Sequence, residues 1–183
     1  GTKVINTDIN VTSKYYADAI QLFDADTTTI QADLYSEATT EAYGMYSTAM
    51  GSGFSQNINL KDSNIKVNAG KATAVLIEGS KNAVMSDSTF DVKGENATAI
   101  TGQIDWMGNI PKNLTAKKLT INLEGTNSKN NDMAFYKCDR LNILDNKLVS
   151  KKGSGITILS TPNAKVTGNY IAVEKKLIGD DAV

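Results

Sequence analysis

A short phrase of alternating polar and large aliphatic residues returns seven times along the 183-residue chain. Its recurrence predicts an all-β fold, a right-handed parallel β-helix of about seven coils with about three short strands in each coil. The lead aliphatic residues stand 25, 31, 25, 29, 29 and 23 residues apart, a period typical of one unit stacked on itself. Because they share one register, we expect them to form a single inward-facing column: Ile9, Leu34, Ile65, Phe90, Leu119, Leu148 and Ile171.

Two further sets of apolar residues recur once per coil and indicate the other two strands. In one set a small residue precedes an apolar one: Ala19-Ile20, Ala74-Val75, Ala99-Ile100, Ala134-Phe135 and Gly155-Ile156, with the weaker Ala42-Tyr43 in the second coil. The other set lies just upstream of the phrase: Val4, Ile30, Ile58, Val84, Leu114, Leu141 or Ile143, and Val166. Each set alternates with polar residues, which is the period of a strand with one buried face.

A single coil of this kind cannot bury its apolar residues, so the pattern requires neighbours. Coils stacked about 4.8 Å apart pair each strand with the next and fill the interior with aliphatic side chains. The corners need residues that tolerate tight or left-handed backbone, which explains the residues around the start of the phrase, Asn64, Asn146, Gly168 and Asn169. A two-sheet sandwich is the alternative fold, although a sandwich does not require one phrase to recur in one register.

The length fits a single β-helix domain over residues 1–183. The chain begins without a charged-then-apolar leader, and its last residues, Asp180 to Val183, resemble the opening of a further strand. We therefore expect a slice of a longer solenoid. Since no apolar run is long enough to span a bilayer, no direct membrane span is expected in this segment. A net charge of −1 without a basic patch argues against nucleic acid as a partner.

Histidine is absent from the sequence, which excludes serine–histidine and cysteine–histidine catalysis and removes the commonest transition-metal ligand. Cys138 is the only cysteine, so no internal disulfide forms and we expect a passive thiol on or near the wall. Arg140 is the only arginine. From the absence of histidine and the single cysteine and arginine, we predict no catalytic residues, no bound metal and no cofactor. Bound Ca²⁺ is the alternative.

Three departures from the regular coil are predicted to be loops on the rod: Glu37 to Gln56, Thr101 to Asn113, and Gly125 to Asp132. The first carries Tyr43 and Tyr46, and the second carries Asp105 and Trp106. A flat ring edged by polar groups suits stacking on a sugar face, so these four residues are the predicted ligand-binding residues. The alternative is that the aromatic rings pack onto the rod wall or plug its end. The third departure is predicted to be only a flexible corner.

Carboxylates are the candidates for an enzymatic site. Asp62 and Asp87 occupy equivalent corner positions on adjacent coils, with Asp91 on the wall and Glu78 on the next strand. Paired carboxylates bind Ca²⁺ or act as the acid and base of a glycosidase. Asp is also common at corners for structural reasons, and Arg140 has no acidic cluster in register with it. Asp62 and Asp87 therefore stand as the alternative calcium ligands.

Three sequons fit the pattern for N-linked glycosylation and begin at Asn10, Asn96 and Asn113. Asn96 and Asn113 are expected in corners, where a glycan could be attached. In a chain rich in Asn and Thr such matches also arise by chance.

The phrase with asparagine-bearing corners, as in Ser63-Asn64-Ile65, Asp145-Asn146-Lys147 and Gly168-Asn169-Tyr170, resembles the parallel β-helix repeat of the pectin-lyase-like superfamily. This resemblance covers nearly the whole chain and is specific for the fold. It supplies no transferable catalytic residues, because lyases, phage tailspikes and adhesins share the repeat. With abundant Lys, Asn and Thr, no His and one Arg, the chain is most similar to adhesin-like surface proteins of archaea and bacteria. That resemblance implies an extracellular, cell-anchored molecule that displays a binding face.

The leading functional hypothesis is a non-enzymatic, secreted or cell-surface adhesin-like segment that binds a glycan or a cell-surface protein. One alternative is a polysaccharide lyase or glycoside hydrolase of the same fold, and another is a structural stalk or surface-layer spacer. An acidic cleft with Ca²⁺ would favour the enzyme, an aromatic face would favour carbohydrate binding, and a bland wall would favour the stalk.

Overall fold

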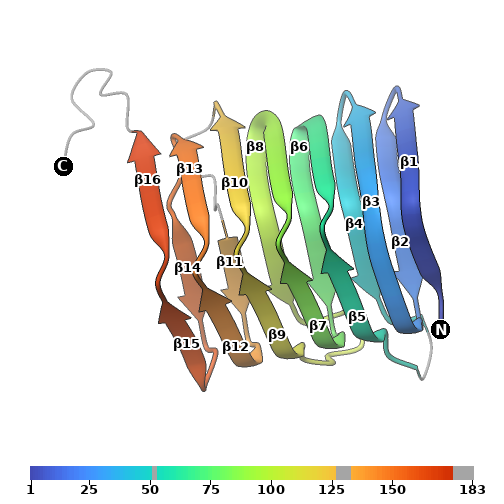
Figure 1. The fold of residues 1–183 in the computed structure, drawn as a ribbon, viewed down its shortest axis with the longest axis vertical. Coiled ribbons are helices and arrows are strands. Elements are labelled where there is room, and N and C mark those ends of the chain that lie inside the picture. The colour runs from blue at the N-terminus through green and yellow to red at the C-terminus, as the bar shows by residue number, and fades with distance from the viewer. Residues whose placement is uncertain (51–52, 127–132, 175–183) are drawn as a thin grey trace.

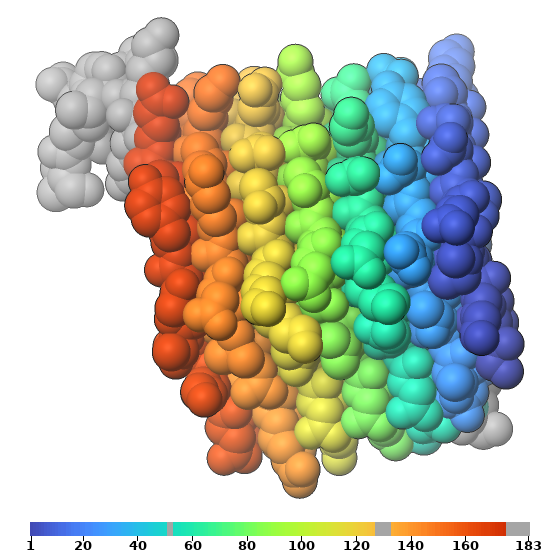
Figure 2. All heavy atoms as spheres, viewed as in Figure 1, coloured from blue at the N-terminus to red at the C-terminus, as the bar shows by residue number. Residues whose placement is uncertain are grey.

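The computed structural model describes residues 1–50, 53–126 and 133–174, and it confirms the parallel β-helix. Its 16 strands join into one sheet that winds around a common core. In Figure 1 the chain climbs the near side of the rod, descends the far side and advances from the N-terminal end to the other. That winding is right-handed, as connections between parallel strands almost always are. Figure 2 shows the coils as successive colour bands along the rod.

The strands form three faces. Face A consists of the first parts of β1 (Lys3–Ser13) and β3 (Asp26–Ala38), then β5 (Gln56–Lys61), β7 (Lys81–Ser86), β9 (Lys112–Lys117), β12 (Asp139–Leu144) and β15 (Ala164–Thr167). Face B consists of the later parts of β1 and β3, the first parts of β6 (Asn64–Glu78) and β8 (Thr89–Gln103), then β10 (Thr120–Gly125), β13 (Lys147–Lys151) and β16 (Tyr170–Glu174). Face C consists of β2 (Tyr16–Phe23), β4 (Glu41–Thr48), the later parts of β6 and β8, β11 (Met133–Tyr136) and β14 (Ile156–Leu159).

Each coil runs from face A through face B to face C. Coils 1 and 2 are β1–β2 and β3–β4, and coils 3 and 4 are β5–β6 and β7–β8. Coil 5 is β9–β11, coil 6 is β12–β14, and coil 7 is described as far as β16. In coils 3 and 4 the expected second and third strands merge into β6 and β8, each of 15 residues. Within the described ranges no helix is long and apolar enough to cross a membrane.

The predicted inward column is confirmed in six of its seven positions. Ile65 pairs with Leu34 on one side and with Phe90 on the other, and both Ile65 and Phe90 are 0 % exposed. The fifth position is wrong: Ile121, not Leu119, pairs with Phe90 and with Leu148. Leu119 and Ile121 are two residues apart, so strand periodicity alone fits both registers equally well.

The two other apolar sets also need corrections. On face A, Val84 pairs with Asn59 and Thr115 and points outward, because Ala83 and Met85 on either side of it are the buried residues. On face C the small residue of coil 2 is Gly44, since Met45 pairs with Ile20 and Val75. In coil 5 the residue in this register is Met133, which pairs with Ile100 and Ile156, rather than Phe135.

At the corner between faces A and B, one residue in each of coils 3 to 7 has left-handed backbone. In coil 6 this residue directly precedes the predicted Asn146. Positive φ is found there at Asp62 (46°), Asp87 (49°), Lys118 (51°), Asp145 (55°) and Gly168 (71°). Of the four predicted corner residues, Gly168 has this conformation, whereas the asparagines serve through their side chains. Asn64 Nδ2 donates to Asp33 Oδ1 at 2.7 Å on the outer surface.

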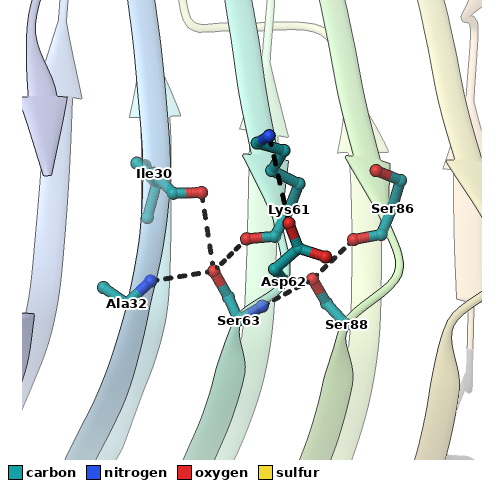
Figure 3. Close-up of polar contacts among 7 residues, drawn as sticks. All are labelled: Ile30, Ala32, Lys61, Asp62, Ser63, Ser86 and Ser88. Atoms are coloured by element: carbon teal, nitrogen blue, oxygen red, sulfur yellow. Dashed lines mark hydrogen bonds and ion pairs between the residues drawn. The ribbon is translucent and has the colours of Figure 1, made fainter. Parts of the chain in front are cut away.

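The next residue of the same corner turns a polar side chain into the rod (Figure 3). Ser63 Oγ accepts from Ala32 N at 3.1 Å and donates to Lys61 O at 2.8 Å. Ser63 N in turn donates to Ser88 Oγ at 3.1 Å. Asn146 and Asn169 repeat the pattern in later coils. This corner ladder satisfies backbone groups that the strand ladders leave unpaired at the bend.

A second ladder runs along the outer corner between faces C and A. Asn113 Nδ2 donates to Asn82 Oδ1 at 2.8 Å, Asn82 Nδ2 to Asn57 Oδ1 at 3.0 Å, and Asn57 Nδ2 to Asp26 Oδ1 at 2.9 Å. All three asparagines have φ between 54° and 55°, a conformation that Asn tolerates better than most residues. The ladder therefore gives these three asparagines a structural role without any ligand.

Candidate binding site

A groove of about 320 Å³ lies on face C, and we call it the tyrosine groove. The register of the strands explains it. Outward positions carry Tyr43 and Tyr46 in coil 2, whereas the same positions carry Thr73 and Leu76 in coil 3. Coil 4 continues with Thr98 and Thr101. The lining residues are Tyr16, Tyr43, Tyr46, Lys71, Thr73, Leu76, Glu78, Thr98, Thr101 and Gln103. Large rings thus stand as a wall beside a floor of smaller side chains.

The wall is held by contacts between aromatic rings. Tyr43 and Tyr46 stack with ring centroids 5.6 Å apart, and Tyr16 packs against Tyr43 at 6.0 Å. Phe23 meets Tyr46 edge-on at 6.0 Å. Such pairs contribute about 0.5–1.5 kcal/mol each beyond the area they bury. Tyr43 is 7 % exposed, whereas Tyr16 is 45 % exposed and offers ring surface to solvent.

Hydrogen bonds orient the tyrosine hydroxyls toward carboxylates. Tyr46 donates to Glu78 Oε2 at 2.7 Å, and Tyr43 donates to Glu41. Burial and the bond to Glu78 raise the pKa of Tyr46 to about 12, and burial with the bond to Glu41 raises the pKa of Tyr43 further. Both hydroxyls therefore remain protonated donors at physiological pH.

The two predicted tyrosines belong to a strand and not to a loop. β4 is paired on both sides, by β2 and β6, so the first departure from the coil is confined to the segment between Thr48 and Gln56. Its aromatic side chains lie outward on a regular strand because coil 2 keeps the face C register. The second departure begins after Gln103 and ends before Lys112. Most of the third, residues 127–132, lies outside the described residues.

Asp105 organises the second loop from within. It is 4 % exposed, and its Oδ1 accepts from Met107 N at 2.9 Å and Asn109 N at 2.8 Å. Its Oδ2 accepts from Asn109 Nδ2 at 2.8 Å. The loop covers Gly79 (φ 59°), where an added Cβ would lie 2.5 Å from Asp105 Oδ2. Both carboxylate oxygens of Asp105 are thus engaged within the protein.

Trp106 joins the two loops. Its ring is 73 % exposed, and its Nε1 donates to the carbonyl of Ala49 at 3.2 Å. Ala49 is three residues beyond Tyr46, or about 10 Å along an extended strand. The structure therefore brings Trp106 to the same end of face C as Tyr46, at the corner next to the groove.

Replacing Trp106 by Ala is expected to lower the free energy of unfolding by no more than about 1 kcal/mol, because the exposed ring loses one hydrogen bond and little buried area. Thermal unfolding followed by circular dichroism measures this. A fall in melting temperature of more than about 5 °C would show instead that the ring is a structural plug.

The predicted calcium alternative rests on Asp62 and Asp87. Asp62 and Asp87 do occupy equivalent left-handed corner positions, yet the described residues contain no group of three His, Cys, Asp or Glu side chains suited to a metal ion. Lys61 Nζ lies 3.9 Å from Asp62 Oδ2. Arg140 (φ 59°) lies between Asp139 and Leu141, which pair with Lys112 and Leu114 on either side of Asn113, and Arg140 does not line the groove.

Cys138 is 1 % exposed and turns into the corner between faces C and A. Its Sγ donates to Gly102 O at 3.4 Å, and burial raises the pKa of the thiol to about 12. A protonated, buried thiol is a poor nucleophile.

The three sequon asparagines lie on different parts of the surface. Asn10 faces outward on β1 and lines a groove of about 630 Å³ on face B. Asn96 lies on β8 near the corner between faces B and C. Asn113 already donates from Nδ2 in the outer ladder. Glycosylation at each of the three remains a prediction.

Several groove residues were not singled out from the sequence, notably Tyr16, Lys71 and Thr101. Lys71 Nζ lies 2.6 Å from Glu41 Oε1, and although burial acts the other way, the bonds from Lys71 and Tyr43 lower the pKa of Glu41. These residues could have been identified from the outward-facing positions of face C. Those positions can be assigned only after the coils have been aligned with one another.

Asp18 lies beside the aromatic wall, in register with Tyr43. Burial raises the pKa of its carboxyl, although bonds from Gln21 and Tyr16 act in the opposite direction, and its Oδ1 is buried without a partner. The pKa of Asp18 is higher in the folded protein than in the unfolded chain, so the folded protein binds more protons between these two pKa values. The free energy of unfolding therefore falls as the pH rises from the unfolded pKa through the folded pKa. Asp18→Asn is therefore expected to raise the melting temperature at pH 7 and to have little effect at pH 3. An equal effect at both pH values in a thermal scan would contradict this.

No family model and no curated protein matches this sequence. Among solved structures, the Streptococcus pneumoniae surface protein and adhesin PfbA is similar at 12 % identity, with a TM-score of 0.23. The match covers 94 % of this chain and 67 % of that chain. So low a score carries no inference about function, which has to come from the chemistry of the groove.

Proposed function

We propose that this β-helix is a non-enzymatic, extracellular adhesin-like segment that binds a surface glycan in the tyrosine groove. The observation that carries the proposal is the wall of Tyr16, Tyr43 and Tyr46 beside a floor of three threonines and Leu76. Ring faces stack on the apolar faces of sugars, while hydroxyl and amide groups at the edge bond to sugar hydroxyls. The volume of about 320 Å³ is at the lower end of ligand sites, which suits one or two sugar rings.

Trp106 extends this site at the corner. Its exposed ring stands on a loop made rigid by Asp105, so little conformational entropy is lost when a ligand packs against it. Asp105 supports this arrangement as a positioning residue, because its own oxygens are already bonded within the loop.

Binding without cleavage fits the charges of the groove. Glu78 is the one carboxylate among the ten described lining residues, whereas glycosidases ordinarily use a pair about 5–10 Å apart. The lack of histidine in the sequence and the absence of Arg140 from the lining residues agree with this interpretation.

The test is to fill the groove. Thr101 is half-buried on the floor, and Thr101→Trp would occupy the space that a sugar ring needs. Thr115→Trp, at a half-buried outward position of face A, is the matched control. On a glycan array we expect the unaltered protein and Thr115→Trp to bind the same glycans and Thr101→Trp to bind none, with all three melting alike.

The alternatives predict other results. Reducing ends or ultraviolet-absorbing unsaturated products released from polysaccharides, and lost in Asp62→Ala or Asp87→Ala, would support the enzyme. An array without any bound glycan would support the structural stalk.

A further inference from the structure

The tyrosine groove has an excess of negative charge. Lys71 is the one cation among the described lining residues, and its Nζ is held 2.6 Å from Glu41 Oε1, outside the lining. Glu78 lines the groove, and Asp18 lies behind the wall in register with Tyr43. The groove and its immediate surroundings thus hold three carboxylates and one ammonium group, although Glu78 alone of the three lines the groove. An acidic glycan would be repelled here, whereas a cation would be attracted.

Glu78 is the member of this set that lines the groove. Its two oxygens accept from neutral donors, the Tyr46 hydroxyl at 2.7 Å and Gln103 Nε2 at 2.7 Å. These bonds fix the carboxylate in place and leave its charge uncompensated. Each carboxylate oxygen can accept a second bond, so a further donor could bind without displacing Tyr46 or Gln103.

The ring of Tyr46 lies next to that carboxylate, since its own hydroxyl makes the bond to Glu78. An ammonium group beside Glu78 would therefore meet the hydroxyl edge of Tyr46, where the phenolic oxygen can accept a hydrogen bond from it. A carboxylate with an adjoining aromatic wall is a combination that recognises amines.

We infer that the glycan bound in the tyrosine groove carries a protonated amino group, as a glucosamine unit does, and that Glu78 and Tyr46 receive it. This inference rests on the proposed glycan-binding function and specifies its ligand class. The ammonium group would donate to Glu78 while the sugar rings occupy the threonine floor beside Tyr43.

Face B offers an internal control. Glu37 has the same kind of bonds as Glu78, accepting from Tyr35 Oη at 2.7 Å and from Asn68 Nδ2 at 3.1 Å. Lys66 and Lys93 line the groove around Tyr35 on that face. Glu37→Gln and Glu78→Gln thus make the same chemical change at carboxylates with the same kind of bonds, but only Glu78 borders the tyrosine groove.

The experiment is calorimetric titration with four probes: a glucosamine tetramer, an N-acetylglucosamine tetramer, a galacturonate tetramer and a tetralysine peptide. We expect the glucosamine tetramer to bind about tenfold more tightly than its acetylated counterpart, with an affinity that falls as salt is added. Glu78→Gln should abolish that preference, and Glu37→Gln should retain it.

Each other outcome is decisive. Equal binding of the two glucosamine-based tetramers, or a preference that survives Glu78→Gln, overturns the inference and leaves glycan binding intact. If tetralysine binds as tightly as the glucosamine tetramer, the groove accepts basic peptides, and the inference that the ammonium group belongs to a glycan is overturned. No binding by these probes, together with an empty glycan array, overturns both the inference and the proposed function.

Discussion

Replacing Ile65 by Asp is expected to unfold the β-helix. Ile65 is 0 % exposed and lies between Leu34 and Phe90 in the interior column. A carboxylate there would have no cation or donor, and an unpaired buried charge costs several kcal/mol, on the order of about 3–5 or more. The whole stability of a domain is about 5–15 kcal/mol. We expect loss of the β-sheet signal in circular dichroism at 25 °C, or aggregation on expression.

Val84→Asp is the matched control, because Val84 lies on the outer surface of face A, in register with Asn59 and Thr115. The added carboxylate would meet solvent, so this variant should fold and melt within a few degrees of the unaltered protein. A folded Ile65→Asp variant, or an unfolded Val84→Asp variant, would show that the strand registers on faces A and B are assigned wrongly.

The β-helix itself was predictable from the repeat. Six of the seven lead residues stack as expected because one aliphatic position per coil must face the same interior. The register of coil 5 was not predictable from alternation, since both Leu119 and Ile121 are buried there. Leu119 occupies in coil 5 the inner corner position that Ser88 occupies in coil 4 and Asn146 in coil 6. Only the pairing of neighbouring coils reveals this equivalence.

The candidate site was predictable in part. Aromatic side chains pointed to Tyr43, Tyr46 and Trp106, and the structure brings Trp106 to the end of the face that carries both tyrosines. The sequence could not show that coil 2 stays regular through both tyrosines, because Gly44 interrupts the alternation there. An added Cβ on Gly44 would lie 2.2 Å from Ile65 Cγ2, so the position needs a residue without a side chain. The groove depends on the contrast between the rings of coil 2 and the smaller side chains of coils 3 and 4, and this contrast appears only when the coils are stacked.

Asn146→Ala is expected to lower the free energy of unfolding by about 2–5 kcal/mol. Asn146 is 3 % exposed, and its Oδ1 accepts from Leu119 N at 2.9 Å. Its Nδ2 donates to Ala116 O at 3.0 Å and to Asn169 Oδ1 at 2.8 Å. Leu119 cannot supply a polar side chain to the corner of coil 5, so the Asn146 side chain links the corners of coils 5, 6 and 7. Alanine would leave the Leu119 N–H buried without its acceptor, which costs more than the bond itself contributes.

Thermal and urea unfolding measure this effect, with an expected fall in melting temperature of about 5–15 °C. Asn142→Ala is the control, because Asn142 is half-buried on the outside of the adjacent strand β12 and its Nδ2 makes only a 3.4 Å bond to Thr115 Oγ1. Asn146→Ser should fall between the two, since Ser88 shows that a hydroxyl at this corner accepts the N–H of the preceding coil. If Asn146→Ala melted like Asn142→Ala, the corner ladder would contribute nothing, and the hydrophobic columns alone would hold the coils in register.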